Sequence, residues 1–130
     1  MTLQTHLKID ERLSGRVTAL REGYARVILH TSEMMTADAK GLIHGGFLFS
    51  AADYAAMAAV NDPYVVLGSS EVRFLAPVAK GQSVDFEATV IEERGRKRVV
   101  SVVGICDGNR VFEGAFVAFV LEGHVLGDRD

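Results

Sequence analysis

The sequence predicts an α+β fold in which a curved antiparallel sheet wraps around one long central helix. Residues 46–60 contain six alanines and no proline, a composition that favours a helix. Two β-type segments precede this stretch and four follow it, with turn residues between them. Strands in hairpin succession around a single helix are typical of an α+β domain.

The two segments before the helix are interpreted as a hairpin. The expected strands and the turn between them are residues 9–20, 24–31 and 21–23. Leu13, Val17 and Ala19 are candidates for the buried side of the first strand. The polar residues 31–40 lack periodicity, so we expect a loop that could cover a pocket.

Proline disfavours helical geometry in the residue before it, so Pro63 is expected to end the helix. The four expected strands after it are residues 64–76, 83–92, 98–106 and 111–121. Apolar residues alternate at Val84, Phe86 and Ala88, as in an antiparallel strand with one buried face.

Length and composition indicate one globular domain, residues 1–130, with peripheral segments at 1–8 and 123–130. The net charge of −3 argues against nucleic acid as a main partner. A single cysteine, Cys106, excludes an internal disulfide and a multi-cysteine metal site, and we expect it to be buried. No secretory signal or membrane-spanning stretch is visible, so a cytoplasmic protein is expected.

Asp53 is the only charged residue in the alanine-rich stretch. Its neighbours on the helix face are Phe49, Ser50, Ala56 and Met57, and none is a cation. A buried carboxylate without hydrogen bonds is costly, and such groups are often functional. The alternatives are that Asp53 faces a solvent strip or bonds a backbone group elsewhere.

Gly45 and Gly46 directly precede the expected helix. Their N–H groups are among the unpaired donors of a helix N-terminus, where the helix dipole is positive. Such donors can hold the oxygen of a thioester carbonyl. The alternative is an ordinary glycine-rich entry to a helix.

These features resemble the hotdog-fold acyl-CoA thioesterases. The specific residues are His44-Gly45-Gly46, Asp53 and the strand end Phe74-Leu75-Ala76-Pro77. The nearest subgroup includes the phenylacetate-pathway thioesterase, and the likeness in layout covers residues 17–120. The resemblance implies a hotdog fold and hydrolysis of an acyl- or aryl-CoA, with the CoA thioester as substrate and no other cofactor or metal.

The resemblance also implies roles for individual residues. Asp53 would act as general base or nucleophile, Gly45 would polarise the thioester carbonyl, and His44 would shape the loop. Asp38 stands where the family commonly has an asparagine, which puts efficient hydrolysis in doubt. Ser69 or Ser70 corresponds loosely to a residue that positions water.

Eight residues separate Gly45 from Asp53, a span of about 12 Å along a helix. One carbonyl carbon cannot lie within hydrogen-bonding range of both. A catalytic pair therefore needs Gly45 from one subunit and Asp53 from another, in the homodimer that the resemblance implies. Pairing of dimers into a homotetramer is left open.

Substrate-binding candidates are Gly46, Ser69, Ser70, Arg73, Arg96, Lys97, Phe49 and Met57. The basic residues could hold CoA phosphates, but a charge run is more often a solvated hairpin, and Arg73 could pair with Glu71 or Asp85. Phe49 and Met57, like Phe47, Tyr54 and Phe74, could line an acyl or aryl pocket or simply fill the core.

Three other functions are considered. The first is an acyl-CoA-binding sensor or regulatory protein that does not hydrolyse its ligand, which Asp38 favours and Asp53 opposes. The second is a hydratase or dehydratase on the same fold, although His6, His30 and His124 are scattered. The third is a structural oligomer, which leaves the helical carboxylate unexplained.

Overall fold

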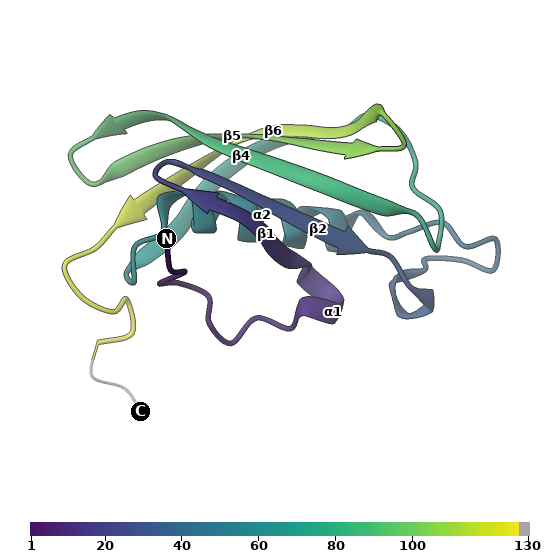
Figure 1. The fold of residues 1–130 in the computed structure, drawn as a ribbon, viewed down its shortest axis with the longest axis horizontal. Coiled ribbons are helices and arrows are strands. Elements are labelled where there is room, and N and C mark those ends of the chain that lie inside the picture. Colours follow the sequence, from purple (N-terminus) through teal and green to yellow (C-terminus); the bar gives the residue numbers. More distant parts are fainter. Residues whose placement is uncertain (128–130) are drawn as a thin grey trace.

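A computed structural model describes residues 1–127 as one six-stranded antiparallel sheet with a long helix on its concave face (Figure 1). The strands lie in the order β1-β2-β4-β5-β6-β3. Their bounds are β1 Arg16–Arg21, β2 Tyr24–His30, β3 Val65–Phe74, β4 Ser83–Arg94, β5 Lys97–Cys106 and β6 Asn109–Val120. The helices are α1 Glu11–Ser14, a 3₁₀ turn η1 at Glu33–Met35, and α2 Gly45–Val60.

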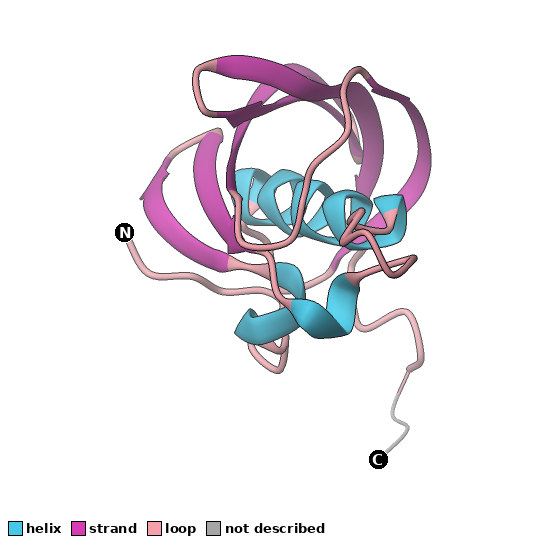
Figure 2. Ribbon diagram, turned by 90° about the vertical axis from the view of Figure 1, so that its right-hand side faces the viewer, coloured by secondary structure: helices cyan, strands magenta, loops and turns pink. Residues whose placement is uncertain are grey.

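Helix α2 is enclosed by the curved sheet (Figure 2). Its six alanines are all buried, and their small side chains let the strands approach the helix closely. Phe86, Phe112 and Phe116 from β4 and β6 fill the core beside the helix. This arrangement confirms the predicted α+β fold with a curved sheet around a central helix.

The expected strand at residues 9–20 is wrong in its first half. Asp10 caps a short helix instead, because its side chain accepts a hydrogen bond from the backbone N–H of Arg12. Gly15 ends that helix with a φ of 87°, and β1 then starts at Arg16. Asp10 also forms an ion pair with Arg12, which lowers the pKa of the aspartate to about 2.

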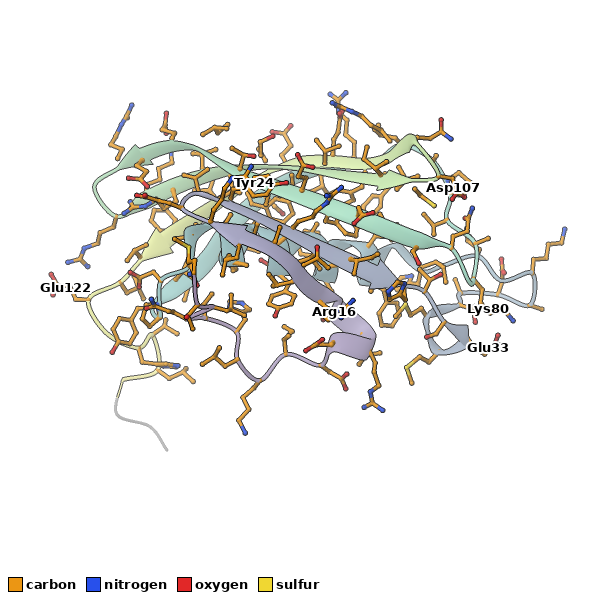
Figure 3. The ribbon with its side chains drawn as sticks, viewed as in Figure 1. Arg16, Tyr24, Glu33, Lys80, Asp107 and Glu122 are labelled. Atoms are coloured by element: carbon orange, nitrogen blue, oxygen red, sulfur yellow. The ribbon has the colours of Figure 1, made fainter. Side chains whose placement is uncertain are left out.

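The remaining strands lie within two residues of their expected bounds. Within the expected loop at 31–40, Met35 of η1 is fully buried. Glu33 and Lys80 form an ion pair of 2.7 Å that joins this segment to the connection between β3 and β4 (Figure 3). Of the tail expected at 123–130, the last three residues lie outside the described part of the chain.

The N-terminal segment lies along α2. The backbone N–H of Gln4 donates to Oδ1 of Asn61, whose amide group donates in turn to the carbonyl of Thr2. The His6 ring stacks on Tyr54, with 6.2 Å between ring centroids. One side of the helix is therefore covered by residues that precede the first strand.

Strand β3 is at one edge of the sheet and pairs only with β6. Its register shifts at Gly68, where a Cβ atom would lie 2.6 Å from the ring of Phe119. Among residues 1–127, no strand pairs with the other edge of β3, and such an edge is a template for pairing with another strand.

Two further expectations concern the single cysteine and membrane-spanning stretches. Cys106 is buried as expected, and burial raises the pKa of its thiol. No helix within residues 1–127 is long and apolar enough to cross a membrane.

Candidate active site

The N-terminus of α2 presents backbone donors. His44 is the N-cap residue, and its own N–H donates to the carbonyl of Met35 at 2.9 Å. Gly45 is the first helical residue, so α2 includes the glycine pair that was expected directly before the helix. In a first turn the amides have no intrahelical acceptor, and within residues 1–127 the amides of Gly45 and Gly46 have no other acceptor.

Phe74, at the end of β3, stands beside Gly45. A Cβ atom at Gly45 would lie 3.2 Å from Cε1 of Phe74, so the ring almost touches the helix backbone. Gly46 differs, because a Cβ there would meet only the exposed ring of His44. The backbone of Gly45 is therefore flanked by an aromatic ring, whereas Gly46 is more exposed.

A cleft of about 290 Å³ opens at this place. Its lining residues are all apolar or glycine, and they come from the loop before α2, from α2, and from the segment after β3. They are Leu42, Ile43, Gly45, Leu48, Phe74, Leu75, Ala76, Pro77 and Val78. The cleft has no hydrogen-bonding side chain, so its polar contacts come from backbone groups.

Asp53 is the only carboxylate of α2. Its Oδ1 is buried and has no hydrogen-bond partner, and the loss of hydration raises the pKa of the carboxyl from 3.8 to about 6. A buried acceptor without a partner costs free energy, so its retention calls for an explanation beyond packing.

The surface of α2 shows where Asp53 points. After Ser50, only Asp53 and Val60 in the helix are not fully buried. Gly46 lies seven residues before Asp53, and Val60 lies seven residues after it, so all three fall on one side of a helix with 3.6 residues per turn. Asp53 thus lies on the strip of α2 that this chain covers least.

The structure places Asp38 in a turn on the surface. Its Oδ1 accepts hydrogen bonds from the backbone N–H groups of Lys40 and Leu42, at 3.0 and 3.1 Å. These bonds fix the turn that leads to His44. A catalytic role for Asp38 stays a prediction, while its contacts within this chain are with the loop backbone.

Several expected substrate-binding residues lie on β3. Ser69, Ser70 and Arg73 are exposed, and Arg73 borders a shallow groove on the outer face of the sheet. Arg73 forms an ion pair with neither Glu71 nor Asp85 within the described residues, and Asp85 lies 3.7 Å from Arg26 instead.

The basic residues at the β4–β5 hairpin are largely engaged within the chain. Arg96 forms an ion pair with Glu122, and Arg98 lies 3.6 Å from Glu93. Lys97 forms no ion pair within residues 1–127 and remains available. The hairpin thus leaves fewer cations for CoA phosphates than the sequence suggests.

The two apolar candidates on α2 pack inward. Met57 has no exposed surface in this chain, and the ring of Phe49 lies 5.5 Å from that of Phe116. From the sequence, Phe74 could either line a pocket or fill the core. Its place beside Gly45 depends on the pairing of β3 with β6, which no local pattern reveals.

The sequence also matches the model of a known protein family. The model of the thioesterase superfamily matches residues 40–113, which include the α2 N-terminus, Asp53 and strands β3 to β5. This chain belongs to the thioesterase superfamily, and its fold is the hotdog fold. The predicted resemblance is confirmed.

Proteins of known structure have a fold similar to that of this chain. An uncharacterized protein from Pyrococcus horikoshii is 47% identical, with a TM-score of 0.95 over 97% of both chains. A mutant of the phenylacetic acid degradation protein PaaI from Thermus thermophilus is 28% identical. Its TM-score is 0.79, over 85% of this chain and 96% of that one.

The curated relatives carry different names, and the chain spans only 26% to 61% of the length of those described here. A methylthioribose-1-phosphate isomerase of Aquifex aeolicus is 50% identical over 93% of this chain and 26% of its own length. A putative esterase of Saccharolobus solfataricus is 35% identical over 69% and 61%. The transcription factor FapR of Caldanaerobacter subterraneus is 28% identical over 76% and 49%.

Proposed function

We propose that this protein hydrolyses the thioester of an acyl-CoA at a site formed between two copies of the chain. The observation that carries the proposal is the unpartnered Oδ1 of Asp53 on the open strip of α2. Membership of the thioesterase superfamily supports the reaction class, and the name of the putative esterase relative is consistent with it.

The proposed site needs the Gly45 amide and the Asp53 carboxylate. Both groups lie on α2, but each site takes them from two different subunits. Gly45 and Asp53 are about 12 Å apart along α2, too far to act on one carbonyl group. A second copy that pairs along the free edge of β3 would bring its Asp53 towards the first copy's Gly45. A two-fold dimer of this kind contains two equivalent sites.

In the proposed reaction, the thioester carbonyl oxygen accepts a hydrogen bond from the Gly45 amide, where the dipole of α2 is positive. The Asp53 carboxylate of the second copy takes a proton from water as the water oxygen adds to the carbonyl carbon. The C–S bond then breaks, and the CoA thiolate recovers the proton. Direct attack by Asp53 gives a mixed anhydride that water cleaves, and is the second route.

The CoA moiety requires cationic or hydrogen-bonding groups near the dimer edge. Arg73, Ser69 and Ser70 on β3 meet this need by position, and Lys97 is a further free cation. Arg96 is already paired with Glu122, so it contributes only if that ion pair opens. No metal or other cofactor is part of the proposal.

A second function is binding of an acyl-CoA without hydrolysis. The similarity to the transcription factor FapR favours it, because that relative has a regulatory name. Asp38 also favours it, because an acid replaces the amide common in the hydrolases. The retained Asp53 with its raised pKa favours hydrolysis.

Release of free thiol from a panel of acyl-CoAs by the wild type and by Asp53→Asn distinguishes the two functions. Hydrolysis that falls by about 10²–10⁴-fold in the variant supports a catalytic base. Saturable acyl-CoA binding without thiol release by the wild type would establish the binding function instead.

A further inference from the structure

We propose that Phe74 determines acyl specificity, and that the apolar cleft beside Gly45 takes the acyl group of the thioester and selects unbranched hydrocarbon chains. The inference rests on the proposed function, since it places the thioester carbonyl at the Gly45 amide. Gly45 is one of the residues that line the cleft, so an acyl group whose carbonyl binds at the Gly45 amide starts next to this space.

The lining of the cleft determines the chemical class of the acyl group. Its side chains are aliphatic or aromatic throughout, without a charged or hydrogen-bonding group. A carboxylate or hydroxyl on the acyl chain would lose hydration there and find no side chain to bond, with only backbone groups in exchange. The volume of about 290 Å³ is at the low end for ligand pockets, so it suits the acyl group rather than the whole acyl-CoA.

Phe74 sets the shape of the cleft next to the carbonyl. Three atoms of its ring lie 3.2 to 3.5 Å from the position of a Cβ at Gly45, so the ring stands beside the helix backbone. In the proposed binding mode, the α-carbon of a thioester held by the Gly45 amide approaches this ring. A methyl branch at the α-carbon would then compete with the ring for space.

The ring of Phe74 packs against the buried core of this chain. It packs edge-on against Phe112, with 5.3 Å between centroids, and Phe112 is fully buried. Within this chain 51% of Phe74 is exposed, so its outer face is open to a ligand at the edge where the proposed second copy pairs. A supported ring with a free face is suited to selecting a ligand by shape.

The test compares the affinities of acyl-CoAs for the protein with Asp53→Asn, which prevents turnover. Hexanoyl-CoA and 2-methylpentanoyl-CoA have the same carbon count and differ in branching, and adipoyl-CoA adds a terminal carboxylate. The measured quantities are the ratios of the Kd values from calorimetric titration. Thiol release by the protein with an intact Asp53 is measured separately, so a failure of hydrolysis is seen independently of the Kd ratios.

With Phe74 present, the affinity for hexanoyl-CoA should be at least about tenfold higher than for 2-methylpentanoyl-CoA or adipoyl-CoA. Phe74→Ala should bring the ratio for the branched isomer close to one and leave the adipoyl-CoA ratio unchanged. Phe74→Leu preserves apolar packing on Phe112 and serves if the alanine variant does not fold. Tyr64→Ala is the matched control, because Tyr64 is 41% exposed but lies outside the cleft.

Equal affinities for the straight and branched acyl-CoAs in both proteins would overturn the proposal, as would tight binding of adipoyl-CoA. The cleft could also be occupied by a second copy of the chain. In that case Phe74→Ala would lower the mass in sedimentation without changing the Kd ratios, and the proposal would be wrong.

Discussion

Gly45 and Asp53 lie on the same helix, eight residues apart, and each has a polar group without a partner within the described chain. The amide of Gly45 points out of the helix start, while the carboxylate of Asp53 lies on the uncovered strip further along. A donor for an oxyanion and a base for water are the two groups that thioester hydrolysis needs. Their separation indicates that one chain provides two half-sites.

The first prediction concerns the pH dependence of hydrolysis. A carboxylate base acts when it is deprotonated, and the pKa of Asp53 is raised to about 6. The value of kcat/KM should therefore rise with pH and level off above about 6. Steady-state kinetics between pH 4.5 and 8 provide the check. A profile already flat at pH 5 would show that another group is the base.

The second prediction concerns stability. Because burial raises the pKa of Asp53 above 3.8, the folded protein binds more protons than the unfolded chain between pH 4 and 6. The contribution of Asp53 to the free energy of unfolding should therefore fall as pH rises through this window. The total change is up to about 3 kcal/mol for two pKa units.

Asp53→Asn is the matched variant for this effect, because it removes the titration and keeps the shape of the side chain. It should be more stable than the wild type at pH 7 and closely similar at pH 4, as measured by urea unfolding. A variant less stable than the wild type at pH 7 would contradict the account of Asp53 as an unpaired buried charge.

The third prediction concerns the structural role of Asp38 in the turn before His44. Asp38→Asn keeps the Oδ1 acceptor for the amides of Lys40 and Leu42, so its stability should match the wild type. Asp38→Ala loses both bonds and should be destabilised by about 1 kcal/mol. Thermal unfolding measures both. Equal stability of the alanine variant would show that the turn does not need these bonds.

The fourth prediction concerns the Gly45 amide. Proline is favoured at the first position of a helix, and His44 has the extended backbone (ψ of 130°) that a following proline requires. Gly45→Pro should therefore fold, yet lose the N–H donor and about 10²–10³-fold in kcat. Gly45→Ala adds the same Cβ next to Phe74 but keeps the N–H, so it is the steric control.

If the alanine variant loses as much activity as the proline variant, contact with Phe74 rather than loss of the donor is responsible. Circular dichroism of both variants verifies that α2 is intact. The kinetic comparison then assigns the effect to the amide alone.

Much of the fold could be predicted from the sequence, because its signals are local. The alanine-rich stretch places α2 to within two residues, and the alternation in β4 places its buried face. The segment at residues 9–20 could not be predicted in the same way. There the cap formed by Asp10 and the positive φ of Gly15 outweigh the weak strand pattern.

The candidate site was predictable where a residue is chemically conspicuous. Asp53 is the only charge in its stretch, and the glycine pair marks the helix start. The wall formed by Phe74 and the N-terminal cover of α2 depend on contacts between distant residues, such as His6 with Tyr54. The ion pairs of Arg96 and Arg98 are likewise tertiary, so the sequence overestimates the free positive charge of the hairpin.

The most direct measurement of the central claim uses hybrid dimers of two inactive variants. One chain has Gly45→Pro and an intact Asp53, and the other has Asp53→Asn and an intact Gly45. Two different affinity tags, used in sequence, isolate dimers that contain one chain of each kind. Each parent dimer, in which both sites are damaged, is the baseline.

If each site takes Gly45 from one copy and Asp53 from the other, the hybrid contains one intact site and one with both substitutions. It should then recover about half the wild-type rate of thiol release per dimer. If Gly45 and Asp53 act together within one chain, every site in the hybrid contains one substitution. A hybrid as inactive as its parents would contradict the shared site.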